Sequence, residues 1–318
     1  MDKPVVSIIM PAFNSAKYIR ESVNSVIRQT FDNWELIIVN DGSTDDTMNI
    51  ADGYAASDLR IRLINQENKK LSAARNTGIA NASGSWIAFL DADDLWVSDK
   101  LEKQLAIAET RPEVGVIFTD GFTFYDDSAK TATPYGTIAG SLSAGTIYKL
   151  EYQGNYIPVL SVIVKKKHVD EVGTQDETLN GCEDWDYWLR LAINGVSFYG
   201  MDDKLFYYRK HAANMSNDSY LMTLAKATVF VKNFKKELLT RADVSRINSF
   251  INITICSFIR LGKIKEALFL NNRMKEASGR IYRNLCSLLM NLFGSRSYYL
   301  VRMVFKVNSL LTINSMAK

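Results

Sequence analysis

Residues 86–94 read WIAFLDADD, an apolar run that ends in Asp91, Asp93 and Asp94. The run has the length and composition of a buried β-strand, so the acids fall at its carboxyl end. Three carboxylates close together destabilise one another, and their desolvation adds to the cost. A bound divalent cation offsets both effects, because carboxylate oxygens suit Mg²⁺ and Mn²⁺. The stretch therefore predicts a metal site at a strand end, completed by a phosphate-bearing substrate.

Two other interpretations of these acids stay open. They can form an acidic turn before the next helix, with Asp93 or Asp94 as its N-cap. A metal-dependent phosphohydrolase of the haloacid dehalogenase type also carries an Asp-x-Asp motif after a strand. In that class Thr or Gly-Thr follows the motif closely, whereas here Asp94 and Leu95 follow it, so the fit is poor.

The rest of the first two-thirds of the chain alternates between strand and helix patterns. Apolar runs predict strands at 5–10, 35–40, 60–65, 86–90 and 114–120, and periodic segments predict helices near 72–81 and 100–109. Ser15 is expected to cap another helix, whose apolar face is Tyr18, Ile19, Val23, Val26 and Ile27. Repeated β–α units predict an α/β fold on a mainly parallel sheet. Ligands of such sheets bind beyond the carboxyl ends of the strands.

Composition divides the 318 residues into two regions. Residues 1–219 hold 21 Lys and Arg against 31 Asp and Glu, and residues 220–318 hold 17 against 4. We therefore expect a first domain over 1–219 and a basic helical region over 220–318. Three widely spaced cysteines suit a reducing cytoplasm. The N-terminus enters a strand pattern directly, so we expect no signal peptide.

The basic region predicts a peripheral membrane contact. No stretch reaches about 18 apolar residues without a charge, so a spanning helix is not expected. Tyr298, Tyr299 and Phe305 lie beside basic residues, as in amphipathic helices on anionic membranes. A helical bundle with a solvated basic face is the alternative. Nucleic acid is not expected as a partner, because no binding-fold signature is present.

Four segments in order carry a family resemblance: VSIIMPAFNSAKYIRESVNSVIRQTF, ELIIVNDGSTDDT, LSAARNTGIANASGSWIAFLDADD and EDWDYWLRL. Together they resemble inverting nucleotide-sugar glycosyltransferases of family 2, which build bacterial surface polysaccharides. The resemblance spans about residues 4–215. It implies a GT-A fold, which is a Rossmann-like, mainly parallel sheet flanked by helices.

The resemblance also assigns a nucleotide-sugar site. Its residues are Pro11, Ala12, Phe13, Asn14, Asp41, Asn68, Arg75, Asp91, Ala92, Asp93 and His211. Asp93, Asp91 and His211 are the implied ligands of Mn²⁺ or Mg²⁺. Alternatives stay open for two of these residues: Asp41 can close its own loop as an Asx-turn, and Arg75 can be a surface helix residue paired with an acid.

The resemblance implies that Asp184 is the catalytic base and that Glu183 holds the acceptor or orients the loop. A sugar hydroxyl becomes a good nucleophile only when a base removes its proton. A single base opposite the leaving diphosphate gives one displacement with inversion. The alternative is an acidic cluster at the N-terminus of the helix that follows.

These inferences predict a metal-dependent hexosyltransferase on the inner face of the cell membrane. Its donor is expected to be a UDP-sugar, and its acceptor a lipid-diphosphate-linked glycan of O-antigen or capsule assembly. Wall teichoic acid or a protein is the alternative acceptor. A metal-dependent phosphohydrolase and a sugar-nucleotide-binding protein without turnover are the alternatives of other classes.

Overall fold

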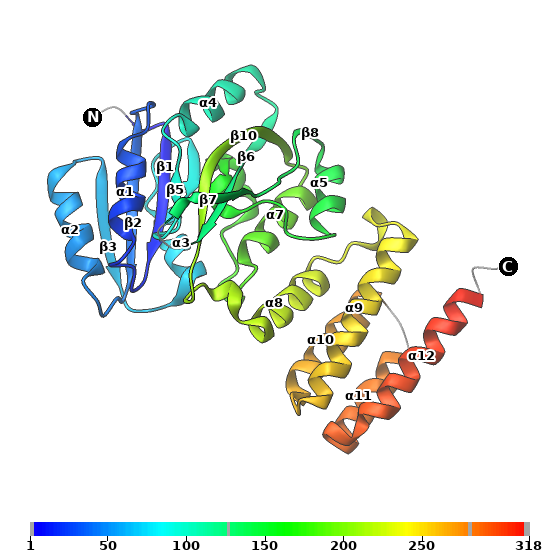
Figure 1. Cartoon of the computed structure of the whole chain (residues 1–318). Coiled ribbons are helices and arrows are strands. Elements are labelled where there is room, and N and C mark those ends of the chain that lie inside the picture. The colour runs from blue at the N-terminus through cyan, green and yellow to red at the C-terminus, as the bar shows by residue number, and fades with distance from the viewer. Residues whose placement is uncertain (1–2, 126–127, 279–281, 315–318) are drawn as a thin grey trace. The chain divides into compact units, whose positions relative to one another are not determined.

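The computed structural model describes residues 3–125, 128–278 and 282–314. The chain forms two compact units, Met1–Asn217 and Asp218–Lys318. Figure 1 shows an α/β unit followed by a unit of helices. The boundary between them lies close to the one expected after residue 219.

One sheet organises the first unit, with the strand order β3-β2-β1-β4-β9-β6-β10-β5. Its strands are β1 (Val6–Ala12), β2 (Trp34–Asp41), β3 (Ile61–Gln66), β4 (Trp86–Phe89), β5 (Leu95–Trp96), β6 (Val114–Tyr125), β7 (Ser128–Pro134), β8 (Gly140–Leu142), β9 (Ile163–Lys165) and β10 (Ser197–Lys210). β3, β2, β1 and β4 run parallel, β10 is parallel to β6, and β9 is antiparallel to both β4 and β6. β5 and β8 pair antiparallel with β10, and β7 pairs antiparallel with β6. The predicted α/β fold with a mainly parallel sheet is therefore confirmed.

The strand β1 shows why the sheet forms where it does. All seven of its residues are buried, and it lies between β2 and β4 in the sheet. A strand covered on both faces reads as a continuous apolar run rather than as an alternation. Its carboxyl end delivers Ala12 beside Asn40 of β2, so the polar loops after these strands emerge together.

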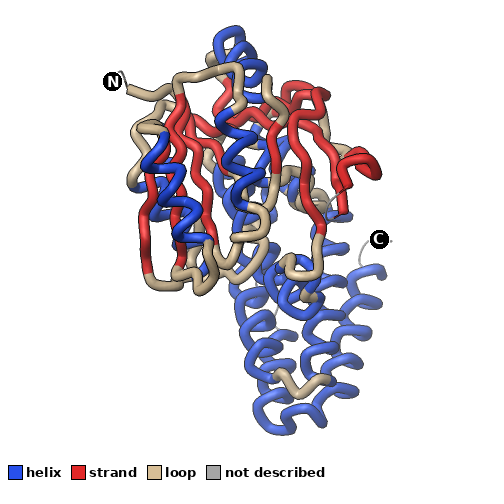
Figure 2. The backbone as a smooth tube through the Cα atoms, turned by 60° about the vertical axis from the view of Figure 1, so that its left-hand side comes forward, coloured by secondary structure: helices blue, strands red, loops and turns tan. Residues whose placement is uncertain are grey.

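Helices lie over the strands of this sheet, as Figure 2 shows. They are α1 (Ile19–Ile27), α2 (Thr47–Ser57), α3 (Lys70–Ala80), α4 (Lys100–Thr110), α5 (Ala144–Glu151), α6 (Lys166–Val172) and α7 (Glu183–Ile193), with 3₁₀ turns η1 (Val159–Ser161) and η2 (Met215–Asn217). The helices predicted near 72–81 and 100–109 correspond to α3 and α4.

The prediction that Ser15 caps the first helix is wrong. The helix α1 begins at Ile19 with Tyr18 as its N-cap. The carbonyl of Ser15 accepts from the backbone N–H groups of both residues, while its hydroxyl donates to the carbonyl of Phe13. A tight turn therefore precedes the helix and uses the backbone of Ser15 in place of its side chain. Ile27, predicted on the apolar face, is 36% exposed.

The second unit consists of α8 (Ser219–Lys232), α9 (Arg241–Arg260), α10 (Ile264–Ser278), α11 (Tyr282–Phe293) and α12 (Tyr298–Asn314), with 3₁₀ turns η3 (Lys236–Leu238) and η4 (Gly294–Ser297). Thr240 and Asp243 form a capping box that starts α9. Ile251, Leu270 and Val301 are fully buried, so these helices share a core. None of the described helices is both long enough and apolar enough to cross a membrane.

Candidate active site

Each of the three acids after β4 has its own partner. Both oxygens of Asp91 accept from Nη2 of Arg75, at 2.8 and 3.1 Å. Oδ2 of Asp93 lies 2.9 Å from Nε2 of His211. Oδ1 of Asp94 accepts from the backbone N–H of Arg209 at 2.7 Å. The acids therefore tolerate one another because different elements supply a donor to each.

Asp93 and Asp94 do not begin a helix, so the N-cap interpretation is wrong. The strand β5 follows them, and Asp99 is the N-cap of α4. Burial raises the pKa of Asp94 well above its usual value, and the charges of Asp93 and Asp91 add to the shift. Burial also raises the pKa of Asp93, with Asp91 contributing and the hydrogen bond from His211 opposing.

Arg75 joins this acidic turn to the helix α7. Its side chain is 2% exposed, which contradicts the alternative of a surface residue. Nη1 donates to Oε1 of Glu183 at 2.7 Å, while Nη2 binds Asp91. Burial alone lowers the pKa of Arg75, but the charges of Asp91 and Glu183 outweigh it and raise the pKa. One permanent cation thus holds acids from two elements together.

The predicted base, Asp184, stands half-buried in the first turn of α7. Its Oδ1 accepts from the backbone N–H of Trp185 at 2.7 Å and from Nδ2 of Asn155 at 3.2 Å. Burial raises its pKa to about 7, the charge of Glu183 adds to the rise, and Arg75 opposes it. A carboxylate with a pKa near the working pH is suited to general base catalysis.

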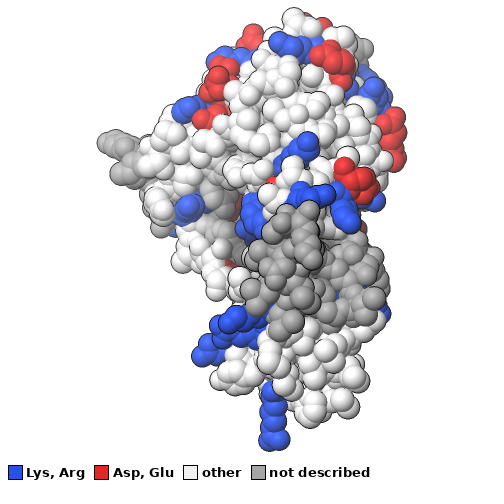
Figure 3. All heavy atoms as spheres, turned by 90° about the vertical axis from the view of Figure 1, so that its right-hand side faces the viewer, with Lys and Arg blue, Asp and Glu red and all other residues white. Residues whose placement is uncertain are grey.

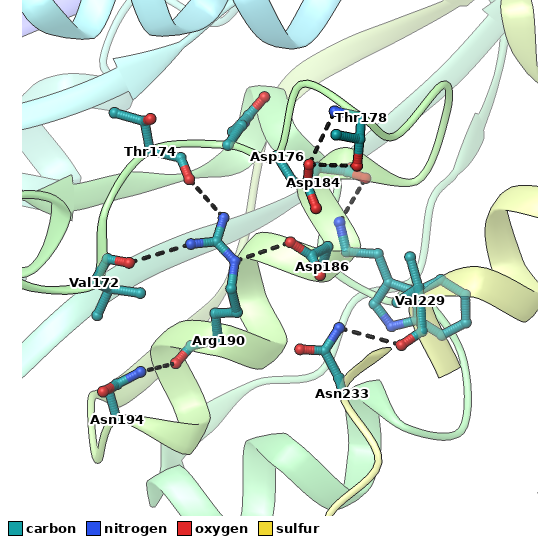
Figure 4. A network of polar contacts seen from close by, with 12 residues as sticks. Val172, Thr174, Asp176, Thr178, Asp184, Asp186, Arg190, Asn194, Val229 and Asn233 are labelled. Atoms are coloured by element: carbon teal, nitrogen blue, oxygen red, sulfur yellow. Dashed lines mark hydrogen bonds and ion pairs between the residues drawn. The ribbon is translucent and has the colours of Figure 1, made fainter. Parts of the chain in front are cut away.

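A second arginine fixes the helix that carries Asp184 (Figure 4). Nε of Arg190 donates to Asp186 at 2.9 Å. Its Nη1 and Nη2 donate to the carbonyls of Val172 and Thr174. The carboxylate of Asp186 is therefore occupied inside the protein, which leaves Glu183 and Asp184 as the acids of this turn that face the site.

Several of the expected nucleotide residues come from the carboxyl ends of β1 and β2 and from the loops after β1 and β3. Pro11, Ala12 and, at the acidic turn, Ala92 are buried, whereas Phe13, Asn14 and Asn68 are exposed. Oδ1 of Asn14 accepts from the backbone N–H of Thr44 at 2.8 Å. This contact ties the first loop to the second.

Asp41 does not close its own loop. Its Oδ1 accepts from Nε2 of Gln66 at 2.7 Å and from the backbone N–H of Lys69 at 2.9 Å. Instead, Oδ1 of Asn40 accepts from the backbone N–H of Ser43, three residues later, and closes the loop after β2. The Asx-turn alternative for Asp41 is therefore wrong, and Asp41 links β2 to the loop that carries Asn68.

His211 follows β10 and meets Asp93 from the opposite side of the acidic turn. Its ring stacks on Tyr18, with centroids 4.8 Å apart. Two residues earlier, Nε of Arg209 donates to the carbonyl of Asp93 at 2.7 Å, and Nη2 binds Glu21 at 2.7 Å. No sequence motif marks Tyr18 or Glu21 as part of this site, because their contacts with Arg209 and His211 join residues far apart in the chain.

The donor set fits a divalent cation only in part. Asp93 and His211 lie together, but both oxygens of Asp91 are engaged by Arg75. Within the described residues, no three His, Cys, Asp or Glu side chains form a set that can hold a metal. Mg²⁺ and Mn²⁺ often bind one or two carboxylates and take their remaining ligands from phosphates and water. Asp93 and His211 fit such a site, and a bound diphosphate has to complete it.

Comparison with known proteins supports the same class. The sequence model of glycosyl transferase family 2 matches residues 7–148. TuaG of Bacillus subtilis (strain 168), provisionally named a teichuronic acid biosynthesis glycosyltransferase, is 36% identical over 72% of this chain and 87% of that protein. EpsE of the same organism, provisionally named a glycosyltransferase, is 31% identical over 76% of this chain and 85% of that protein.

Two solved structures share the fold. TarS 1–349 of S. aureus, in complex with UDP-GlcNAc, has a TM-score of 0.68 at 17% identity, over 95% of this chain and 92% of that chain. The mannosyltransferase PcManGT of Pyrobaculum calidifontis, in complex with GDP-Man and Mn²⁺, has a TM-score of 0.54 at 16% identity, over 97% and 86%.

The sheet, with its acids at the strand ends, has the architecture of GT-A glycosyltransferases. The chain belongs to glycosyltransferase family 2, which confirms the family predicted from its motifs. This membership disfavours the phosphohydrolase alternative.

Proposed function

We propose that the protein transfers a sugar from a UDP-sugar, a UDP-hexose, to a hydroxyl of a cell-surface polysaccharide, with inversion. The observation that carries the proposal is the bridge through Arg75, which places Asp91 of the strand-end turn beside Glu183 and Asp184 of α7. A donor site and a base are thereby built into one rigid unit. The name of TuaG and the UDP-GlcNAc complex of TarS support this choice of product and donor.

The proposed reaction uses Asp184 as the general base. Its carboxylate removes the proton of the acceptor hydroxyl while that oxygen forms a bond to the anomeric carbon. The bond between this carbon and the diphosphate oxygen breaks, and the electron pair leaves with the diphosphate. Glu183 stays paired with Arg75 and so keeps the base turn in place. The pKa of Asp184, about 7, leaves the base ionised in a large share of molecules at neutral pH.

The charge that grows on the leaving diphosphate needs a counter-charge. A divalent cation at Asp93 and His211 would supply it as a Lewis acid. The protein's part is to hold these two ligands: Arg209 fixes the backbone of Asp93, and Tyr18 fixes the ring of His211.

Calorimetric titration of UDP, with and without Mn²⁺, tests the donor site. We expect metal-dependent binding in the wild type and its loss in Asp93→Ala. Asp203→Ala is the matched control, because Asp203 is an exposed acid of the same unit. Equal binding with and without Mn²⁺, or no UDP binding at all, contradicts the proposed donor site.

We also propose that the acceptor is lipid-diphosphate-linked, as in O-antigen or capsule assembly, and that the second unit contacts the inner face of the cell membrane. Large apolar side chains of α11 and α12 are exposed: Leu285, Leu288, Leu292, Phe293, Tyr299 and Met303. Arg296, Arg302 and Lys306 are exposed nearby, and the sequence has no acid after Glu276. Figure 3 shows Lys and Arg standing out on the helical unit. Apolar and basic side chains without acids suit an anionic lipid surface.

The burial of the aromatic residues changes which of them are available for the proposed contact. Phe305, expected on the membrane side, is 6% exposed and belongs to the core, whereas Tyr299 is 78% exposed. Tyr299, Met303 and Lys306 are spaced four and three residues apart, so they share one face of α12. On α11, Leu285, Leu288 and Leu292 share a face in the same way.

Flotation with phosphatidylcholine vesicles, with and without phosphatidylglycerol, tests the membrane contact. We expect binding only to anionic vesicles, and a loss of about fivefold for each charge removed from Arg296, Arg302 and Lys306 by substitution with Gln. Leu292→Glu should weaken binding about tenfold or more, whereas the control Leu59→Glu, an exposed leucine of the first unit, should not. If the protein does not bind the vesicles, or if these substitutions leave vesicle binding unchanged, the proposed membrane contact is contradicted.

A further inference from the structure

The helix that carries the base also holds a loop against it. The indole Nε1 of Trp185 donates to the carbonyl of Glu151 at 2.7 Å. The indole Nε1 of Trp188, one turn later, donates to the carbonyl of Ile157 at 2.9 Å. Both indoles are buried. The segment 152–157, which follows α5, is therefore tied at both ends to the helix of Asp184.

Between these two anchors the loop presents an amide and an aromatic ring. Asn155 is exposed, and its Nδ2 donates to Oδ1 of Asp184 at 3.2 Å. The next residue, Tyr156, is 38% exposed, and its backbone N–H donates to Oε1 of Glu151 at 3.2 Å. Glu151 is fully buried, and its Oε2 has no hydrogen-bond partner among the described residues. The loop is thus supported by the buried Glu151, and its exposed residues Asn155 and Tyr156 form a tip that contacts Asp184 through Asn155.

The chemistry of this tip matches a sugar. The faces of a pyranose ring carry C–H groups that pack on an aromatic ring, and the ring edge carries hydroxyls that an amide can bind. Tyr156 directly follows the residue that contacts Asp184, and it is 38% exposed. One edge of its ring lies against Gly154, and the exposed part of the ring is available to a ligand.

We propose that Asn155 and Tyr156 form the acceptor subsite, in which the ring of Tyr156 packs on the acceptor pyranose and Asn155 binds one of its hydroxyls. This inference rests on the proposed transferase function. The hydroxyl that reacts then lies at Asp184, which Asn155 already contacts. The acceptor class is a glycan whose terminal pyranose exposes a C–H face next to the hydroxyl that is glycosylated.

The test separates acceptor binding from donor chemistry. Saturation-transfer NMR measures binding of a panel of octyl pyranosides to the full chain loaded with UDP and Mn²⁺. In parallel, hydrolysis of UDP-GlcNAc, UDP-glucose and UDP-galactose is measured without acceptor. We expect Tyr156→Ala to weaken the binding of the best pyranoside about tenfold, and to raise its KM in transfer to the same extent. UDP binding, donor hydrolysis and donor KM should stay at the wild-type level.

Two variants control for indirect effects. Tyr156→Phe keeps the ring and should restore acceptor binding, which a role limited to the tyrosine hydroxyl does not predict. Tyr125→Ala removes another exposed tyrosine of the same unit, which is 60% exposed, and should change nothing. Circular dichroism confirms that each variant is folded.

The outcomes distinguish the two proposals. Unchanged pyranoside binding in Tyr156→Ala, or no saturable binding in a wild type that hydrolyses its donor, overturns the subsite. An equal rise of donor and acceptor KM also overturns it. Pyranoside binding that depends on Tyr156, in a protein that neither transfers nor hydrolyses any donor, supports the subsite and contradicts the proposed function.

Discussion

Nη1 of Arg75 lies 2.7 Å from Oε1 of Glu183, a residue 108 positions later in the chain. The other terminal nitrogen binds both oxygens of Asp91. Because the guanidinium is planar and always charged, it can hold two carboxylates in fixed directions, which a lysine ammonium cannot. The acidic turn after β4 and the first turn of α7 are therefore coupled through one buried side chain.

Replacing this side chain is expected to affect both stability and catalysis. Arg75→Lys keeps the charge but loses the two guanidinium nitrogens that bind Asp91 and Glu183 in fixed directions. We therefore expect kcat/KM to fall on the order of 100-fold. Arg75→Gln leaves two acids without their cation, and it should lower the free energy of unfolding by about 3 kcal/mol or more. Chemical denaturation and steady-state kinetics measure the two effects. Arg62→Gln is the control, because its guanidinium is about half exposed; a similar loss in that variant contradicts a special role for Arg75.

The proposed role of Asp184 as the base predicts the pH dependence of the reaction. The base acts when it is deprotonated, and its pKa is about 7. We therefore expect kcat/KM to rise about tenfold per pH unit below pH 7 and to level off above it. Arg75 lowers this pKa, so in Arg75→Gln the rising limb should move to higher pH. A profile that is flat between pH 5 and 8 contradicts Asp184 as the base.

Removal of the base carboxylate tests the same assignment directly. Asp184→Asn keeps the size and the hydrogen bond to Asn155, and we expect a loss of kcat on the order of 1,000-fold with unchanged UDP binding. Glu177→Gln changes an exposed acid of the preceding loop and should retain activity. A fully active Asp184→Asn variant excludes this residue as the base.

Arg209 is expected to position the two candidate metal ligands. Its guanidinium lies over the rings of Tyr18 and Phe124, 4.8 and 4.6 Å from their centroids, and it donates to the carbonyl of Asp93. Arg209→Lys keeps the charge but cannot stack or donate in the same directions. We expect Mn²⁺-dependent UDP binding to weaken about tenfold, with UDP binding in the absence of metal unchanged.

Two comparisons separate this role from a general loss of structure. Lys210→Gln, at the next and exposed position, should bind UDP and Mn²⁺ as the wild type does. Calorimetry should also show that Glu21→Gln, which weakens the ion pair of Arg209 with this exposed carboxylate, has a smaller effect than Arg209→Lys. Equal metal affinity in Arg209→Lys and the wild type contradicts the positioning role.

The sequence predicts those parts of the site that depend on residues close together in the chain. The strand β4 and its acids are read from WIAFLDADD, because an apolar run followed by carboxylates marks a strand end. The partners of those acids are set by the order of strands in the sheet, which one sequence does not specify. Glu21 meets Arg209 across 188 positions, and Asn155 meets Asp184 across 29. Neither contact leaves a periodic or spaced signal.

The predictions for Ser15 and Phe305 are wrong because local pattern does not specify these contacts either. Ser15 is a good N-cap residue by type, but the turn before α1 uses its carbonyl instead. Phe305 has the spacing of an exposed amphipathic face, but packing of the helices in the second unit buries it. In neither case does the residue type or its spacing specify the contact that the folded chain makes.

Lys100 provides a test of buried charge outside the active site. Its side chain is fully buried, its Nζ donates to Oε1 of Gln104 at 2.6 Å, and it lies over the ring of Trp96. Burial lowers its pKa well below the ordinary value of 10.5. In the unfolded chain the amine keeps its ordinary pKa and is protonated at neutral pH, so folding disfavours that proton.

The sign of the pH effect follows from this difference. Stability is full above about pH 10.5 and falls by about 1.4 kcal/mol per pH unit as the pH drops toward the folded-state pKa. Lys100→Met removes the titrating group, so it should raise the free energy of unfolding at pH 7 by about 1 kcal/mol or more. The gain should shrink at pH 9.5, where less of the unfolded amine has to lose a proton. Urea denaturation at both pH values measures it, with Lys103→Met as control, because the side chain of Lys103 is 42% exposed. Equal destabilisation of Lys100→Met at both pH values would show instead that the contacts of Lys100 with Gln104 and Trp96 outweigh its desolvation.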